Sequence, residues 1–117
     1  MSEKSNHHRI DYIEFPASSA APARDFYSSV FGWKFTDYGP TYTAFEDGRL
    51  AGGFQASPAD RSSKPLAVIY SSNLEASLAS VKNAGGKITR EIFSFPGGRR
   101  FHLADPDGYE LAVWSEA

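Results

Sequence analysis

The order of elements repeats along this chain, and that repeat constrains the fold more than any other feature. Each half predicts a strand, a helix and three further strands. The stretches 32–36 (GWKFT) and 85–89 (GGKIT) resemble each other and fall at the same place in the two halves, directly after the helix. A match at equivalent positions of two identical element orders favours a duplicated βαβββ module. Because neither half could bury its sheet face alone, we expect the halves to pair.

The first half shows these elements in its apolar pattern and its turn residues. Residues 10–15 are mostly β-branched and aromatic, which predicts a strand that Pro16 ends. Ser18 and Ser19 predict the start of a helix, and Gly32 predicts its end. This helix has an apolar stripe at helical spacing, made of Ala23, Phe26, Tyr27 and Val30. Three strands follow, at 33–36, 42–45 and 50–55, separated by Gly-Pro and Asp-Gly turns.

The second half begins after a linker at 56–65 with a strand at 66–70. Ser72 and Glu75 match a capping box at the start of a helix. The remaining elements are an apolar helical stripe (Leu74, Leu78, Val81), a glycine stop at 85–86 and strands at 87–93, 99–103 and 110–114. We therefore expect modules at about 9–55 and 66–116 in one domain at 9–117, preceded by a disordered tail at 1–8.

Composition excludes several classes of protein. A chain of 117 residues fits one domain, and its formal charge of -2 gives no basic field for nucleic acid or an anionic membrane. Cysteine is absent, which excludes disulfides, thiol nucleophiles and Cys-rich zinc sites and fits a cytoplasmic protein. No apolar run approaches the roughly 20 residues of a membrane span. We expect neither nucleic acid nor a membrane as a partner.

The motifs of the chain resemble those of the vicinal oxygen chelate superfamily, which contains glyoxalases, bleomycin resistance proteins and dioxygenases. The resemblance covers residues 10 to 116 and rests on five stretches: 23–27 (ARDFY), 30–33 (VFGW), 51–54 (AGGF), 83–87 (NAGGK) and 105–111 (DPDGYEL). It implies an α+β fold in which two βαβββ modules form a curved mixed sheet, a cup with the helices outside. It also implies a homodimer. It does not imply one activity, because such a fold hosts many.

Members of that superfamily that bind a metal place His or Glu at inward strand positions. By this resemblance those positions fall on Tyr12, on residues 53–55, on Leu66 and on Ala112. Leucine and alanine offer no donor atom, whereas a divalent ion needs several N, O or S donors. We therefore expect no metal and no other cofactor.

Strand alternation predicts which side chains line the cup once the helix-facing residues are taken to be Ile13, Phe15, Phe101, Leu103, Leu111 and Val113. The candidate ligand-binding residues are then Tyr12, Tyr42, Gln55, Tyr70, Arg100, Glu110 and Trp114. Glu14 and His102 also point inward and are candidate catalytic acids or bases. The simpler alternatives are a structural His102, a Glu14 paired with Arg100, a solvated Glu110, and core packing for Tyr12 and Trp114.

Three functions remain open from the sequence. The first is a protein that binds a small organic molecule in its cup without a metal, as the aromatic and polar lining suggests. The second is a glyoxalase-like lyase or isomerase, or a dioxygenase-related enzyme, with Glu14 or His102 as acid or base. The third is an interaction module whose cup is filled by its own side chains. The sequence does not decide whether the protein is an enzyme.

Overall fold

The computed structural model describes residues 6–116 as two compact units. One unit is Tyr12–Leu66, and the other joins residues 6–11 to residues 67–116. Of the tail expected at 1–8, residues 1–5 lie outside the described residues. In residues 6–8, the amide of His8 donates to the carbonyl of Tyr70 at 2.7 Å.

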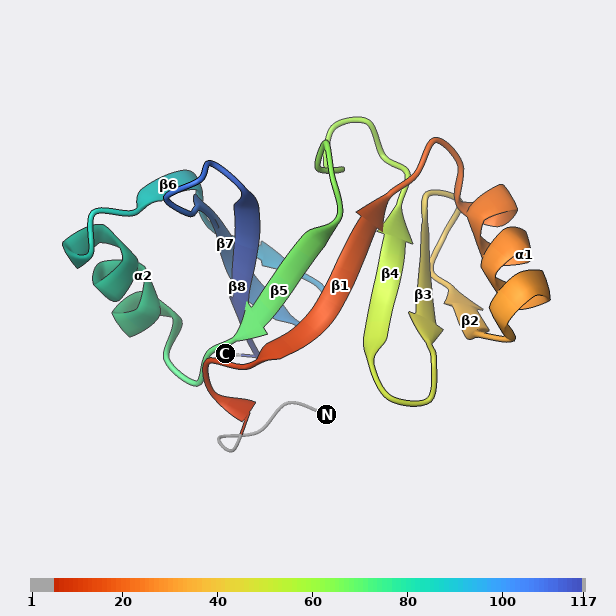
Figure 1. The fold of residues 1–117 in the computed structure, drawn as a ribbon, viewed down its shortest axis with the longest axis horizontal. Helices are drawn as coiled ribbons and strands as arrows, with labels where there is room; N and C mark the ends of the chain where they lie inside the picture. Colours follow the sequence, from red (N-terminus) through yellow and green to blue (C-terminus); the bar gives the residue numbers. More distant parts are fainter. Residues whose placement is uncertain (1–5, 117) are drawn as a thin grey trace. The chain divides into compact units, whose positions relative to one another are not determined.

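The order of elements is strand, helix and three strands, twice. The first module contains β1 (Ile10–Pro16), α1 (Ala20–Phe31), β2 (Lys34–Asp37), β3 (Tyr42–Glu46) and β4 (Ala51–Gln55). The second contains β5 (Leu66–Tyr70), α2 (Leu74–Asn83), β6 (Lys87–Phe95), β7 (Gly98–Ala104) and β8 (Glu110–Ser115) (Figure 1). Each bound lies within one or two residues of the sequence prediction, because turn residues separate the elements.

The two modules share one topology. The first has the strand order β2-β3-β4-β1, with β1 parallel to β4. The second has the matching order β6-β7-β8-β5, with β5 parallel to β8. The other neighbouring pairs inside each module are antiparallel. The expected α+β fold, with two βαβββ modules and a mixed sheet that does not close, is therefore confirmed.

The core of the first module is aromatic and lies between its sheet and α1. The ring of Phe54 lies 5.1 Å from that of Phe15 and 5.0 Å from that of Tyr27. The ring of Phe45 lies 4.5 Å from that of Trp33. Phe15 therefore faces the helix, as alternation predicts.

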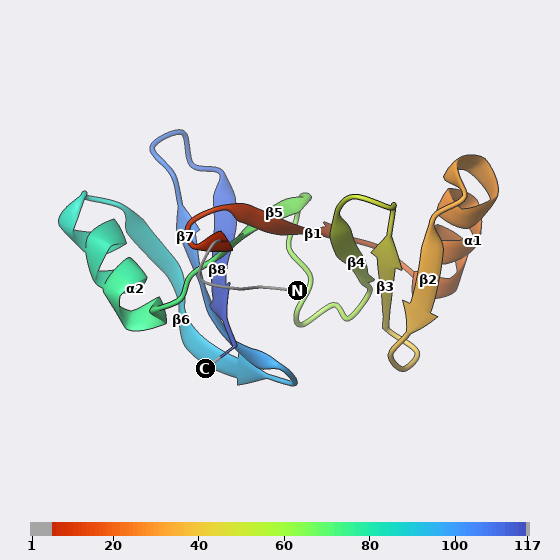
Figure 2. The same cartoon turned by 90° about the horizontal axis from the view of Figure 1, so that it is seen from below.

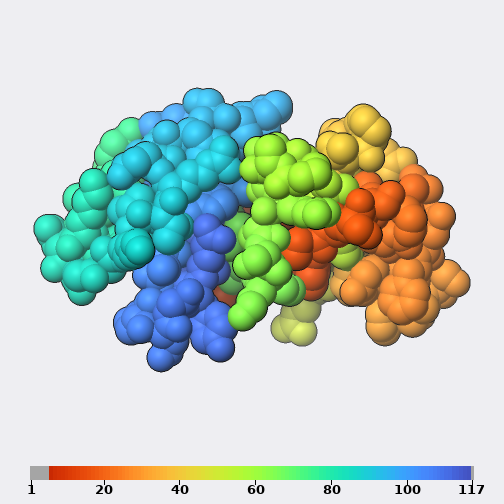
Figure 3. All heavy atoms as spheres, turned by 90° about the horizontal axis from the view of Figure 1, so that it is seen from above, coloured from red at the N-terminus to blue at the C-terminus, as the bar shows by residue number. Residues whose placement is uncertain are grey.

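The apolar stripe predicted for α1 is only partly buried. Tyr27 packs on the sheet, but Phe26, Val30 and Phe31 are exposed. Figure 3 shows α1, in orange, on the surface of its module. Tyr27 already covers the aromatic side chains on this face of the sheet. The neighbouring apolar residues of α1 therefore stay outside the core.

The core of the second module lies between its sheet and α2 (Figure 2). Phe101, Leu74 and Val113 are buried, and Leu78, Val81 and Leu103 are among the apolar residues packed against them. Phe101, Leu103 and Val113 thus take the helix-facing positions that alternation predicts, and the intervening residues of β7 and β8 point to the other face.

The capping box predicted at the start of α2 is wrong. The N-cap is Asn73, whose side-chain oxygen accepts a hydrogen bond from the amide of Ala76 at 3.1 Å. Glu75 instead binds Arg99 on β7, with 2.6 Å between Oε2 and Nη1. The amide of Ser72, which Glu75 would accept in a capping box, donates to Nδ1 of His7 instead.

Neither helix within residues 6–116 is long and apolar enough to cross a membrane.

Candidate functional site

A histidine and a carboxylate pair on the face of the second module that lies opposite α2. His102 is on β7, and Glu110 is the first residue of β8. The Nδ1 atom of His102 lies 3.0 Å from Oε2 of Glu110, and the hydroxyl of Thr89 on β6 donates to the same oxygen at 3.1 Å. The side chain of His102 is only 5% exposed, whereas that of Glu110 is 36% exposed. Thr89 and Glu110 thus fix the orientation of a buried imidazole.

The surroundings of His102 determine its protonation. Burial lowers the pKa of His102 below its ordinary value of 6.5, and Arg100 and Arg90 lower it further, against the opposing effect of Glu110. Because a neutral imidazole has one N–H group and a carboxylate only accepts, we assign the proton to Nδ1. The Nε2 atom then carries a lone pair, and it is buried without a hydrogen-bond partner among the described residues.

Arginine and aromatic side chains share this face with His102. Cross-strand pairing places Arg90 opposite His102, and Arg100 opposite both Phe93 and Trp114. The guanidinium carbon of Arg90 lies 3.6 Å from the centre of the Phe93 ring, and that of Arg100 lies 5.5 Å from it. Below, "the His102 face" means His102, Arg90, Arg100, Phe93, Phe95 and Trp114.

Trp114 is held at the edge of the His102 face by its neighbours. Its indole N–H donates to Oδ2 of Asp11 at 2.9 Å. Its ring lies 6.2 Å from that of Phe95 and 5.4 Å from that of Tyr70. The hydroxyl of Tyr70 donates to Glu116 at 2.9 Å. These contacts fix the plane of an aromatic ring that is only partly buried.

A second polar cluster lies on the first module, on the sheet face opposite α1. The hydroxyls of Tyr12 and Tyr42 are hydrogen-bonded, and that of Tyr42 donates to Oε2 of Glu14 at 3.3 Å. Glu14 is 4% exposed. Burial raises the pKa of Tyr42 far above 10.0, and Tyr12 and Glu14 add to the effect. Tyr42 therefore stays protonated and is the donor to the carboxylate.

The structure divides the residues predicted from the sequence between these two clusters. It brings together Tyr12, Tyr42 and Glu14 on the first module, and His102 with Glu110 and Tyr70 with Trp114 on the second. Gln55 takes part in neither set of contacts, since its side-chain oxygen accepts the amide of Ser57 at 3.0 Å.

The sequence prediction missed Thr89, Arg90, Phe93 and Phe95. All four lie on β6, whose pairing with β7 shifts register between Ile88 and Arg90 and again between Arg90 and Phe93. A bulge reverses the alternation beyond it, so simple alternation assigns the wrong faces. No signal in the sequence marks these two shifts.

The residues at the family's metal positions do not fit a divalent cation. Leu66 and Ala112 have no donor atom, and the hydroxyl of Tyr12 is bonded to that of Tyr42. Among residues 53–55, where the remaining metal position falls, only Gln55 has a polar side chain, and its oxygen accepts the amide of Ser57. In residues 6–116 no three His, Asp or Glu side chains gather closely enough to hold a metal ion.

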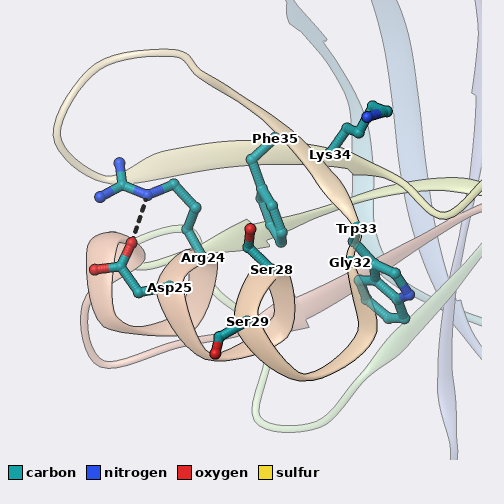
Figure 4. Close-up of a pocket in the computed structure, with 8 residues that line it drawn as sticks. All are labelled: Arg24, Asp25, Ser28, Ser29, Gly32, Trp33, Lys34 and Phe35. Atoms are coloured by element: carbon teal, nitrogen blue, oxygen red, sulfur yellow. Dashed lines mark hydrogen bonds and ion pairs between the residues drawn. The ribbon is translucent and has the colours of Figure 1, made fainter.

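Two hollows lie beside α1 on the surface of the first module. One, of about 530 Å³, is drawn in Figure 4 and is lined by residues of α1, of the segment that leads into β2 and of β2 itself, among them Arg24, Ser28, Trp33 and Lys34. The other, of about 350 Å³, lies at the helix start between Phe15 and Phe26. Neither hollow is lined by a residue of the predicted site.

Comparison with known proteins supports the fold and its superfamily. A family model described as "Glyoxalase/Bleomycin resistance protein/Dioxygenase superfamily" matches residues 9–113. No curated protein sequence matches the chain.

Solved structures of low sequence identity share the fold. Methylmalonyl-CoA epimerase from Mycobacterium tuberculosis has a TM-score of 0.74 at 11% identity, covering 100% of this chain and 93% of that one. A glyoxalase/bleomycin resistance protein/dioxygenase superfamily member from Vibrio splendidus has a TM-score of 0.71 at 15% identity, covering 91% and 97%. A structure described as NAD-dependent benzaldehyde dehydrogenase from Legionella pneumophila has a TM-score of 0.75 at 15% identity, covering 91% and 98%.

Proposed function

Because the chain belongs to the glyoxalase/bleomycin resistance protein/dioxygenase superfamily, we propose that it binds a small organic molecule against the His102 face, without a metal ion. The superfamily supplies the fold, and the fold alone does not select an activity. The proposal therefore depends on the chemistry of this face: a buried nitrogen lone pair, two guanidinium groups and three aromatic rings.

The unpartnered Nε2 atom of His102 carries the proposal. A buried acceptor without a donor costs about 1–3 kcal/mol, so such an atom is rarely left unpaired unless another molecule supplies the donor. The expected ligand has an O–H or N–H group for Nε2. It also has a planar part that packs beside Phe93, Phe95 and Trp114, as ligands do in sites with a few fixed polar groups among apolar ones.

The side chains at the family's metal positions support the proposal that no metal is needed. Leu66 and Ala112 cannot coordinate, and the side chains of Tyr12 and Gln55 are already bonded. Binding is then expected to be the same in the presence of a chelator. Dialysis against Zn²⁺, Ni²⁺ or Mn²⁺, carried out on the His7→Asn, His8→Gln variant to remove binding by that histidine pair, is expected to leave no stoichiometric metal on the protein.

A thermal-shift screen tests the ligand-binding proposal. The probes are phenols, aromatic carboxylic acids and planar aromatic antibiotics, because a compound that binds only the folded protein raises its Tm. His102→Asn keeps an N–H group directed at Glu110 but removes the atom at Nε2, and it should weaken binding of a hit about tenfold. His102→Gln, which places a polar atom near Nε2, should bind more tightly than His102→Asn. Equal affinities for the wild type and His102→Asn would refute the proposal.

A second candidate function is acid–base catalysis, which the chain from Thr89 through Glu110 to His102 favours. A neutral imidazole with its Nδ1 proton held by a carboxylate can accept a proton at Nε2, and nearby arginines stabilise an anion formed beside it. Glu14, which accepts the hydroxyl of Tyr42, is the other candidate acid or base. An enzyme of this kind would exchange a substrate C–H proton with D₂O, and His102→Asn would abolish the exchange. Binding of a hit without any exchange favours the first function.

We also propose that the protein is a cytoplasmic homodimer. The exposed side chains of Phe26, Val30 and Phe31 on α1 form an apolar surface that a second copy could cover, and the absence of cysteine suits a reducing compartment. Light scattering after size-exclusion chromatography tests the dimer, and Phe31→Glu should shift it to a monomer if α1 forms the interface.

A further inference from the structure

Residues 8 and 9 are bound to the end of β5 by main-chain hydrogen bonds. The amide of His8 donates to the carbonyl of Tyr70 at 2.7 Å, and the amide of Tyr70 donates to the carbonyl of Arg9 at 3.0 Å. A turn precedes this pairing, in which the amide of Arg9 donates to the carbonyl of Asn6 at 3.0 Å. Residues 6–11, called the N-terminal strap below, therefore continue the second module although α1 and three strands separate them in sequence.

His7 binds the strap to the segment that leads into α2. Its Nδ1 atom accepts the backbone amide of Ser72 at 2.9 Å, and the hydroxyl of Ser72 lies 3.1 Å from the same atom. A backbone amide can only donate, so Nδ1 of His7 must offer a lone pair for this bond to exist. Protonation of Nδ1 and the bond from Ser72 are mutually exclusive.

His8 makes a second contact, to a buried pair of serines. Its Nε2 atom lies 2.9 Å from the hydroxyl of Ser77, which lies 2.7 Å from that of Ser71. Ser71 is fully buried and accepts the amide of Asn73, the N-cap of α2. The rings of His7 and His8 stack with 3.7 Å between their centres. Two positive charges at that separation would repel each other strongly.

We propose that the N-terminal strap is an acid-released latch, docked on the second module while His8 is neutral and released when His8 takes up a proton. Two features of the site oppose a positive charge on His8: the stacked ring of His7, and the N-terminal end of α2 with its partial positive charge. A released strap loses both constraints, so acid shifts the equilibrium towards release.

The pKa of His8 supports the same direction. Loss of hydration lowers the pKa of His8 below 6.5, and the nearby His7 lowers it by a smaller amount. The pKa of His8 is therefore lower in the docked strap than in the released strap, where it takes its ordinary value of about 6.5. Release is favoured as the pH falls below this ordinary value. Docking is therefore favoured at pH 7.5 and weakened at pH 5.5.

The charged and titratable groups around the strap come from four elements. Glu75 on α2 is bound to Arg99 on β7, the carboxylate of Glu116 after β8 accepts the hydroxyl of Tyr70, and Asp11 of the strap itself accepts the indole of Trp114. Arg9, next to His8, adds further positive charge. In these contacts each of the three carboxylates accepts a donor other than His7 or His8.

Amide hydrogen exchange followed by NMR tests the latch on the full chain. Protection factors, which remove the intrinsic effect of pH on exchange, should fall at least tenfold for the amides of Ser72 and Tyr70 between pH 7.5 and pH 5.5. The protection factors of the amides of Phe101 and Val113, which lie in the core, should not change. Unchanged protection at Ser72 and Tyr70, or an equal loss at Phe101 and Val113, would contradict a local latch.

Matched variants separate titration from loss of contact. In His7→Asn with His8→Gln, amide groups take the places of the ring nitrogens and do not titrate, so protection at Ser72 and Tyr70 should be the same at both pH values. In His7→Leu the acceptor for Ser72 is gone, so protection should be low at both. A double variant that still loses protection in acid would overturn the proposal, because the histidines could not then be the cause.

Discussion

The phenol hydroxyl of Tyr42 lies directly over the α-carbon of Gly53, on the face of the first module opposite α1. A β-carbon at residue 53 would overlap both the hydroxyl oxygen and the ring carbon that bears it, and would come within 2.7 Å of the hydroxyl of Tyr12. The absence of a side chain at Gly53 is therefore what allows Tyr42 to reach Tyr12 and Glu14 across the sheet.

Gly53→Ala should destabilise the protein by displacing Tyr42, at about 1–3 kcal/mol for an overpacked site. Urea unfolding measures the loss. The matched control is the same substitution in a Tyr42→Ala background, where only the contact with the Tyr12 hydroxyl remains and the added methyl group should cost less. An equal cost in both backgrounds would show that Tyr42 does not depend on Gly53.

Phe101→Ala should lower the free energy of unfolding by about 3–5 kcal/mol, because Phe101 is completely buried at the centre of the α2 core. Phe26→Ala on α1 removes the same ring from a position that is 56% exposed in the single chain, and should change the free energy of unfolding of the monomer by less than about 0.5 kcal/mol. Chemical denaturation of both variants measures the contrast. Similar losses for the two would mean that the core is assigned wrongly, or that the exposed surface of α1 is covered in solution.

Asn73→Ala should cost about 1 kcal/mol, since the side chain of Asn73 accepts the amide of Ala76 at the start of α2. Ser72→Ala should cost less, because the Ser72 hydroxyl bonds His7 and no amide of the helix. Thermal unfolding at neutral pH ranks the two variants. A larger loss of stability for Ser72→Ala than for Asn73→Ala would instead support the capping box formed by Ser72 and Glu75.

The pKa of His102 should lie below 6.5, and Glu110→Gln should lower it further, because the carboxylate is the group that favours the charged imidazole. As the pH falls, His102 takes up its proton in the unfolded chain before it does so in the folded protein. The free energy of unfolding should therefore fall as the pH drops below about 6.5, and should stop falling once the pH is below the pKa of His102 in the folded protein. His102→Asn should remove this part of the pH dependence. NMR titration of the ring protons and urea unfolding against pH provide the measurements, and a higher pKa in Glu110→Gln would contradict the electrostatics.

Alternation and turn residues were sufficient to predict the order of the elements, whereas the curved mixed sheet was predicted from the resemblance to the superfamily. The assignment of Phe15, Phe101 and Val113 to the helix-facing sides is correct, because each lies on a strand with a regular pleat. Glycine is required at residue 52, because a β-carbon there would overlap the carbonyl oxygen of Ile13 and the ring of Phe45.

The remaining features depend on contacts that local sequence does not encode. The faces of Arg90 and Phe93 follow from two register shifts in β6, and the direction of Glu75 follows from an arginine on another strand. The bond between Asp11 and Trp114 joins residues 103 apart in the chain. His102 and Glu110 were both predicted as site residues from strand alternation, but their pairing appears only once the geometry of the β7–β8 hairpin is known.

Long-range ¹H–¹⁵N NMR of the His102 ring tests the central claim most directly, since it reports which nitrogen carries the proton and what that nitrogen meets. At pH 7.5 the wild type should show a proton on Nδ1 and a lone pair on Nε2, and a compound that raises the Tm should move the Nε2 resonance more than that of Nδ1. A proton found on Nε2 in the free protein, or a tightly bound compound that leaves both resonances unmoved, would contradict the account.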